Sequence, residues 1–230
     1  MCRLAQYAPR CCVAVVSCIA PMEEAQAAGG AHVVDDAEVE TPGLCHAESW
    51  ISLFGADRGL VNVAPACTFE ALPMAEIGGA IQHVWGTGHG QVLAGPALKF
   101  ALTPVDRGIG LGVGLSTAID LDTGRVEAAT ILLPVTLDLS RQVRANLNVA
   151  YLWARGNNRH SAFIGAQVDF RASRTVSLMA EAFGRDRRRF GAQAGLRWTP
   201  RSWLDVDFLA GRYVDGTSTR ALTLGVTVRR

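Results

Sequence analysis

The sequence of 230 residues lacks the long apolar run that a membrane-spanning helix requires, which is about 18 consecutive apolar residues. Hydrophobic residues nevertheless make up 49% of the chain and charged residues only 19%, whereas about a quarter of the residues are charged in a typical soluble domain. A transmembrane β-barrel reconciles these properties, because lipid-facing and interior-facing residues alternate along its strands. The net charge of +1 argues against nucleic-acid binding.

Motifs of known enzymes and metal sites are also missing. The sequence contains no GxSxG, HExxH or P-loop motif, and no CxxC or HxxxH spacing that would suit zinc. His160 and Ser161 are adjacent, so on a strand they would point to opposite faces and could not form a base–nucleophile pair. We therefore expect no enzyme activity, no metal and no cofactor.

The clearest pattern that is present lies in residues 108–119, GIGLGVGLSTAI. Large aliphatic residues alternate strictly with Gly, Ser or Ala, and a period of two is typical of a β-strand. A soluble sheet would place polar residues opposite its core-facing side, but here the second face is almost bare. We interpret the stretch as part of a barrel wall with its aliphatic face in lipid and its small face toward the interior.

Similar segments of about ten residues, separated by turn signals, follow one another from residue 44 to the end of the chain. Tilted strands that span a membrane need about 9 to 11 residues. The predicted fold is therefore all-β: a closed, antiparallel, up-and-down transmembrane β-barrel of about 12 strands over residues 44–230. The strands are predicted at residues 44–54, 60–70, 74–84, 91–102, 108–119, 125–138, 142–154, 160–170, 175–183, 189–198, 203–212 and 218–230.

A soluble exported β-barrel that binds an apolar ligand would show the same alternation with its faces exchanged. Soluble surfaces are usually rich in Lys and Glu, whereas the chain has a single lysine, Lys99, and its second face is dominated by Gly, Ala and Ser. The membrane barrel is favoured, and the soluble barrel remains an alternative.

The N-terminal region predicts export. Arg3 and Arg10 precede or flank a short apolar core, and Ala25-Gln26-Ala27 fits a signal cleavage site. We predict a cleaved signal peptide at residues 1–27, with a buried helix or a lipobox at Cys18 as alternatives. Residues 28–43 are acidic and end in Pro-Gly, and we predict a periplasmic N-terminal segment there. The expected location is the bacterial outer membrane, with its lipid and the barrel insertion machinery as partners.

Two cysteines, Cys45 and Cys67, would remain after signal cleavage, in an oxidising compartment. They lie symmetrically about the turn near residues 56–58 and on the same face of their strands. This arrangement predicts a cross-strand disulfide. Two free thiols or a metal site are the alternatives.

Charged residues on the small face would point into the barrel. The predicted lumen-lining residues are Glu48, Glu76, Lys99, Arg144, Asp169, Glu181, Arg197, Asp205 and Asp207. Folding neighbouring strands about their turns places Glu76 opposite Lys99, and Arg197 opposite Asp205. Facing opposite charges stabilise a sheet modestly. These pairs serve either structure alone or selection of a solute, as charged rings do in pores.

Arginines gather beside an outside-facing loop at Arg185, Arg187, Arg188 and Arg189. Because guanidinium groups make bidentate contacts with phosphate, one hypothesis is a rim that binds lipopolysaccharide. A solvated basic rim is the alternative.

A short pattern at the start of the predicted barrel resembles a known family. Asp35-Asp36, followed by TPGxCxxExW over residues 41–50, is similar to the start of small proteobacterial barrels grouped with the transporters of the MetA pathway of phenol degradation. The resemblance covers the first strand and the general barrel plan. It implies uptake of small molecules, aromatic ones included. The chain departs from such barrels by ending in Arg229-Arg230 instead of the aromatic residue that the insertion machinery reads.

Taken together, these patterns predict an outer-membrane barrel that is a passive channel for small solutes. The alternative within the same fold is a non-conducting barrel that is structural or binds lipopolysaccharide or a partner.

Overall fold

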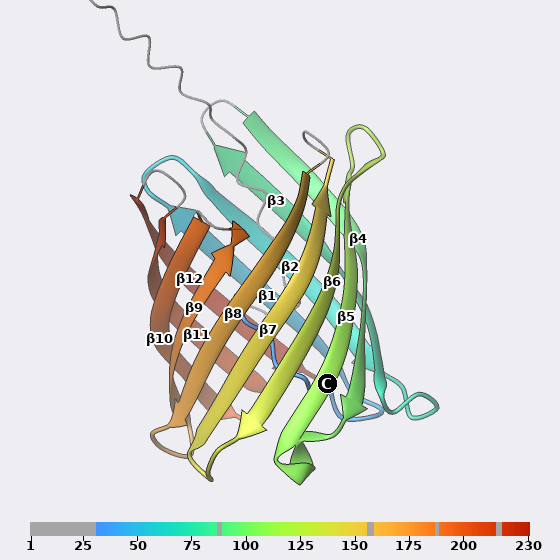
Figure 1. Cartoon of the computed structure of the whole chain (residues 1–230), viewed down its shortest axis with the longest axis vertical. Coiled ribbons are helices and arrows are strands. Elements are labelled where there is room, and N and C mark those ends of the chain that lie inside the picture. Colours follow the sequence, from blue (N-terminus) through green and yellow to red (C-terminus); the bar gives the residue numbers. More distant parts are fainter. Residues whose placement is uncertain (1–30, 87–88, 156–158, 187–188, 215–217) are drawn as a thin grey trace, which may run out of the picture.

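Twelve antiparallel strands close into a single barrel in the computed structural model of the chain (Figure 1). The structure describes residues 31–86, 89–155, 159–186, 189–214 and 218–230. Each strand pairs with its neighbours in sequence, and β1 pairs with β12 to close the sheet. The strands are β1 (Cys45–Phe54), β2 (Gly59–Thr68), β3 (Ala75–Gly86), β4 (His89–Thr103), β5 (Ile109–Asp120), β6 (Arg125–Asp138), β7 (Val143–Ala154), β8 (Arg159–Arg171), β9 (Val176–Arg185), β10 (Arg189–Arg201), β11 (Leu204–Val214) and β12 (Ser218–Arg229). The predicted fold is confirmed, and β6 has the predicted bounds.

The outer surface of the barrel is aliphatic because each strand turns its large apolar residues outward at every second position. On neighbouring strands, Ile131 is 50% exposed and Val149 is 54% exposed, whereas Leu132 on the inward face is only 2% exposed. Contiguous apolar surface of this kind is rare on soluble monomers. Within the described residues, no helix is long and apolar enough to cross a bilayer.

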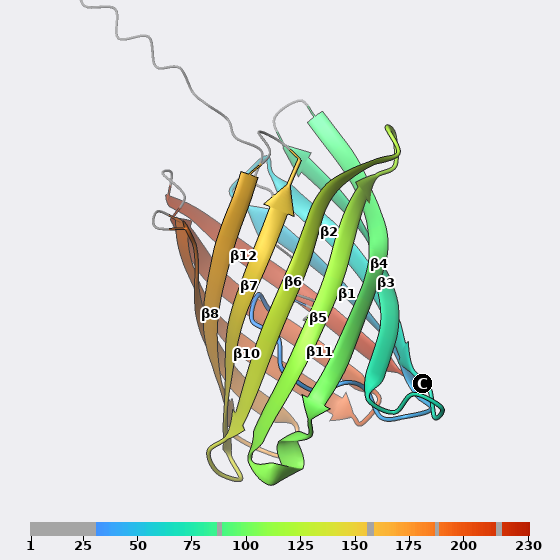
Figure 2. The same cartoon turned by 45° about the vertical axis from the view of Figure 1, so that its right-hand side comes forward.

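Residues 31–40, which we call the inner segment, lie inside the barrel. Figure 2 shows this blue stretch crossing the interior and leaving at the end of the barrel where the C-terminus lies. Ala31, Val34 and Ala37 are all buried. The sequence predicted a periplasmic segment at residues 28–43, and its described part from 31 to 40 is instead inside the barrel. The predicted signal peptide, residues 1–27, lies outside the described residues.

A tight turn at residues 41–44 carries the chain from the interior into the wall. The Leu44 N–H donates to the Thr41 carbonyl oxygen at 3.0 Å, and Gly43 has a φ of 87°. A type II turn requires positive φ at its third residue and favours Pro at its second, which the Thr41-Pro42-Gly43 sequence supplies. The same residues carried the family resemblance.

Where the inner segment packs against the wall, glycines leave the inner face of the wall without side chains. A Cβ built on Gly225 would lie 2.6 Å from the Ala31 Cβ, and one built on Gly165 would lie 2.7 Å from the Val34 Cγ2. Both distances are too short for real side chains. The two glycines therefore leave space that the inner segment occupies.

The bare face of β5 has the same explanation. A Cβ on Gly112 would lie 3.3 Å from the Ala37 carbonyl oxygen, and one on Gly110 would lie 2.4 Å from the Cγ2 of Val105. Val105 begins the short 3-10 helix η1 (Val105–Arg107), which packs against this strand. The small face of β5 is thus matched to two pieces of chain inside the barrel.

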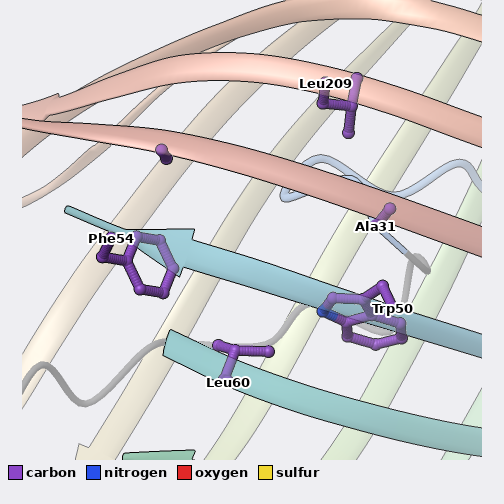
Figure 3. Close-up of a cluster of buried hydrophobic side chains, with 6 residues drawn as sticks. Ala31, Trp50, Phe54, Leu60 and Leu209 are labelled. Carbon is purple, nitrogen blue, oxygen red and sulfur yellow. The ribbon is translucent and has the colours of Figure 1, made fainter. Parts of the chain in front are cut away.

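Large side chains fill the interior beside the start of the inner segment. Figure 3 shows Trp50 and Phe54 on β1, Leu60 on β2 and Leu209 on β11 around Ala31, and all five belong to one buried cluster. This part of the interior is packed by side chains.

The strand register supports one predicted charge pair and corrects the other. Glu76 lies opposite Lys99, as predicted. Arg197 lies opposite Asp207, so its predicted pairing with Asp205 is wrong. The cause is the position of the turn: Arg201 pairs with Leu204, so the hairpin folds about residues 202–203 and not about Arg201.

The predicted disulfide is present. Cys45 on β1 and Cys67 on β2 lie directly opposite each other and are joined by an S–S bond. The bond ties the first hairpin together at the end where the chain enters the wall.

Replacing both Cys45 and Cys67 with Ser should lower the stability of the barrel. The disulfide joins residues 22 positions apart, and a cross-link of this span contributes about 3 kcal/mol when it restricts the unfolded chain. The urea midpoint of tryptophan fluorescence in detergent micelles would measure the loss. The parent chain in reductant should match the double variant, and three equal midpoints would contradict the expectation.

A Gly225→Ala substitution should displace the start of the inner segment, because its Cβ would collide with Ala31. Gly114→Ala is the matched control, since the nearest atom to its added Cβ is 3.4 Å away on Leu132. Limited proteolysis of the folded barrels, with the cuts mapped by mass spectrometry, would detect release of residues 31–40. Faster cleavage in Gly225→Ala alone is expected, and equal cleavage in both variants would refute the displacement.

Candidate functional site

The interior wall is polar, and most of its strands contribute. Strand alternation turns these side chains inward, and buried polar groups need hydrogen-bond partners. The buried polar residues of the wall include Ser52, Asn62, Gln82, Lys99, Thr136, Asn146, Asn148, Gln167, Glu181, Gln193, Asp205, Asp207 and Thr223. The inner segment supplies partners for several of them.

Glu181 on β9 binds the main chain of the inner segment. Its two carboxylate oxygens accept hydrogen bonds from the N–H groups of Val33 at 3.0 Å and Val34 at 2.9 Å. The side chain is 5% exposed, and Gln167 and Gln193 also donate to it. A buried carboxylate is costly unless it is hydrogen-bonded, so these N–H groups stabilise it inside the barrel.

Asn148 on β7 binds the next main-chain unit from both sides. Its Oδ1 accepts from the Asp35 N–H at 2.7 Å, and its Nδ2 donates to the Asp35 carbonyl oxygen at 2.8 Å. A side-chain amide that pairs with both groups of one residue imitates a neighbouring strand. The Thr136 Oγ1 on β6 accepts from the Ala37 N–H at 2.8 Å, so the same mode of recognition continues along the segment.

Lys99 on β4 holds the acidic part of the inner segment. Its Nζ lies 2.9 Å from the Asp35 Oδ1 and 3.2 Å from the Asp36 Oδ1. Asp35 is 5% exposed, and a buried carboxylate is costly unless it is paired and hydrogen-bonded. Lys99 supplies that partner and holds Asp36 with the same ammonium group.

Two arginines bind the acidic residues that follow. Arg144 on β7 pairs through Nη1 with Glu38 and through Nε with Asp138 at 2.8 Å. Arg229 on β12 pairs through Nε with Glu40 at 3.0 Å. Together with Lys99, these arginines give each acidic residue at positions 36, 38 and 40 a cation from the wall.

Two further wall carboxylates, Glu76 and Asp205, join this network at the end of the barrel where the inner segment leaves. The Glu76 Oε2 on β3 accepts from the Glu40 N–H at 2.9 Å, and the Arg229 Nη1 also lies 2.7 Å from the Asp205 Oδ2. His46 lies within 3.8 Å of Glu76. These contacts fix the point where the inner segment leaves the barrel.

Arg197 and Asp207 form a second ion pair between β10 and β11. The guanidinium contacts both carboxylate oxygens, at 2.8 and 3.1 Å, and Asp207 is 1% exposed. The His32 Nε2 lies 3.5 Å from the same carboxylate. This pair serves the wall and also lies beside the start of the inner segment.

The remaining predicted residues lie elsewhere. Glu48 and Asp169 are half-buried at inward positions of β1 and β8, and neither makes a hydrogen bond to the inner segment among the described residues. Arg185 donates to the Ser161 hydroxyl at 3.2 Å, which places it on the interior side of the barrel mouth. Arg189 begins β10, and Arg187 and Arg188 lie outside the described residues. The lipopolysaccharide rim stays a prediction.

In the part of the chain that the structure describes, no group of three or more His, Cys, Asp and Glu residues could hold a metal ion. The wall can bind an acidic segment of chain in two ways. It forms hydrogen bonds with the main-chain groups of the segment and ion pairs with its carboxylates.

No sequence motif marks this arrangement, because Asn148, Thr136 and Arg229 are residue types that are common in barrel walls. One signal was available: the acidic residues at positions 36, 38 and 40 recur with a period of two. The predicted wall has few inward cations, and each needs a partner carboxylate. Acidic residues at this spacing could therefore have suggested that the segment lies inside the barrel and pairs with them.

Solved structures of outer-membrane channels share the fold. The KdgM porin matches with a TM-score of 0.65 at 7% identity, covering 80% of this chain and 98% of its own. The COG4313 outer membrane channel from Pseudomonas putida F1 matches with a TM-score of 0.63 at 9% identity, covering 85% and 98%. Identities this low support the fold alone. No curated protein matches the sequence, and the resemblance to the MetA-pathway transporters stays a prediction.

A family model covers nearly the whole chain. It is described as "Uncharacterised conserved protein UCP029691" and matches residues 15–230, so the chain belongs to this family.

Proposed function

We propose that the chain is a passive channel for small solutes in the bacterial outer membrane, with an opening limited by its own inner segment. The observation that carries the proposal is the pairing of an exposed aliphatic outer face with a buried, charged interior in one closed barrel. Lipid can cover the first face, and water and polar solutes suit the second.

The same distribution disfavours a soluble carrier of apolar ligands. Such a barrel needs an apolar cavity and a polar exterior, and here the faces are reversed: Ile164 is 65% exposed, whereas Gln167 and Glu181 are buried. Export through a cleaved signal, and insertion by the barrel machinery despite the C-terminal Arg229-Arg230, belong to the proposal.

The solved relatives in fold support a channel. KdgM has been solved in complex with disordered oligogalacturonate, and the COG4313 protein is described as an outer membrane channel. Their sequences are too different for any solute to be assigned to this chain from them.

One observation favours a second candidate, a non-conducting barrel that is structural or binds a partner or lipopolysaccharide. The inner segment occupies the interior and takes up the polar groups of Glu181, Asn148 and Lys99. A barrel filled in this way conducts only if the segment leaves space or moves.

Reconstitution of the refolded mature chain, starting near residue 28, into planar bilayers separates the two candidates. Stable ohmic steps are expected of the channel. A folded, heat-modifiable barrel without steps would reject the channel and favour the second candidate, and a chain that stays soluble without detergent would reject both.

A Lys99→Glu substitution should raise the conductance and shift the ion selectivity toward cations. It removes the contacts of Lys99 with Asp35 and Asp36 and adds a repelling carboxylate, and breaking a buried ion pair costs about 3–5 kcal/mol. Single-channel current and reversal potential in a salt gradient would measure both effects.

Arg155→Gln is the matched control, because Arg155 is exposed and lies 3.8 Å from Glu127, away from the inner segment. Its conductance should equal that of the parent. If Lys99→Glu also left conductance and selectivity unchanged, Lys99 would have no part in limiting the channel.

A further inference from the structure

We propose that the interior is a binding track for a peptide, which the inner segment occupies as an internal substitute, and that short acidic peptides are the solute class. This inference deepens the proposed channel and rests on it, because a peptide solute must enter the barrel to reach the track.

The first argument is recognition of the main chain. Glu181 accepts two consecutive N–H groups, Asn148 pairs with both main-chain groups of Asp35, and Thr136 accepts the Ala37 N–H. These contacts involve no side chain of the segment, so another peptide that follows the same bent main-chain path would present the same groups. In peptide-binding proteins, main-chain hydrogen bonds supply affinity and side-chain pockets supply specificity.

The second argument is a set of side-chain positions with a defined preference. Residues 31, 34 and 37 are Ala, Val and Ala, and their side chains lie beside Gly225, Gly165 and Gly110 of the wall. A Cβ on Gly225 or Gly165 would collide with the Ala31 or Val34 side chain. A peptide that fits should therefore carry side chains no larger than Ala at the position of residue 31 and no larger than Val at that of residue 34.

The third argument is charge. Lys99, Arg144 and Arg229 meet acidic residues at positions 36, 38 and 40. These cations come from three separate strands and converge on one stretch of chain. They favour peptides with carboxylates at the positions of residues 36, 38 and 40.

Ala31 and Val33 pack against apolar clusters of the wall, but from residue 35 to residue 40 the track is polar, and this polarity suits an occupant that exchanges. If the inner segment were a permanent filler, apolar packing would hold it as well, since replacing buried ion pairs by apolar residues is often neutral or stabilising. A polar wall has a different advantage: water can satisfy Glu181, Asn148 and Lys99 when the occupant leaves. An apolar wall would be left facing water.

Because the inner segment is covalently attached, it competes at an effective concentration in the millimolar range. A free peptide should bind well only when the attached segment is weakened. The full-length variant Asp36→Asn with Glu38→Gln does this, since it removes contacts to Lys99 and Arg144 and leaves the wall unchanged. Gly225→Ala is a second, independent way to loosen the segment.

The probe is a fluorescent synthetic peptide with the sequence of residues 31–42, AHVVDDAEVETP. Fluorescence anisotropy with the folded variant in micelles measures binding, and block of single-channel current measures access to the lumen. Saturable binding to the weakened variants, and much weaker binding to the parent, is expected.

A second peptide tests whether the main chain is what the wall recognises. N-methylation at the positions of Val34 and Asp35 keeps both side chains and removes the N–H groups that Glu181 and Asn148 accept. Affinity should fall at least about tenfold, because each hydrogen bond to a charged group is worth roughly that factor.

Wall substitutions complete the test. In the weakened chain, Asn148→Ala should reduce peptide binding, whereas Ser52→Ala should not, because the Ser52 hydroxyl is bonded to Thr223 across the β1–β12 seam. Absence of saturable binding, or equal binding of the N-methylated peptide, would overturn the peptide track. Current steps without peptide binding overturn this inference alone, and peptide binding without current steps overturns the channel while keeping the site.

Discussion

The hydrogen bonds from the Val33 and Val34 N–H groups to the buried Glu181 carboxylate are the contacts on which the occupied interior depends. A carboxyl group buried in such a place must be hydrogen-bonded, and wall glutamines meet only part of that need. The inner segment supplies the rest with groups that every residue except proline carries. Its position is therefore fixed by the backbone first and by side chains second.

The wall and the inner segment also fit each other sterically. The bare face of β5 is an odd feature for a strand, because glycine weakens strands and offers nothing to pack. Inside this barrel it makes room for Ala37 and Val105, as Gly165 and Gly225 make room for Val34 and Ala31. The small residues of the wall pack against the small residues of the segment, so the presence of each set is explained by the other.

The barrel could be predicted from the sequence because its signal is local. Alternation with a period of two marks each strand, and the turn residues mark its ends, so the strands, the disulfide and the Glu76–Lys99 pairing followed. The inner segment repeats only its acidic residues at every second position, and its partners are remote: Val33 and Glu181 are 148 residues apart. The Arg197 pairing failed for a different reason, since Arg201 pairs with Leu204 and the hairpin folds about residues 202–203, later in the chain than the turn signal indicated.

A barrel whose interior holds the inner segment can still conduct, because the contacts of the segment with Glu181, Asn148 and Lys99 are polar. A hydrogen bond inside a protein contributes only about 0.5–1.5 kcal/mol net, since water replaces it when it breaks. Water can thus replace each hydrogen bond between the inner segment and the wall, and it hydrates the polar groups of the wall when the segment moves away. The turn at Thr41-Pro42-Gly43 and the neighbouring disulfide fix the exit of the segment, whereas residues 31–38 are held to the wall by noncovalent contacts alone. The same chemistry that fills the interior therefore allows it to open.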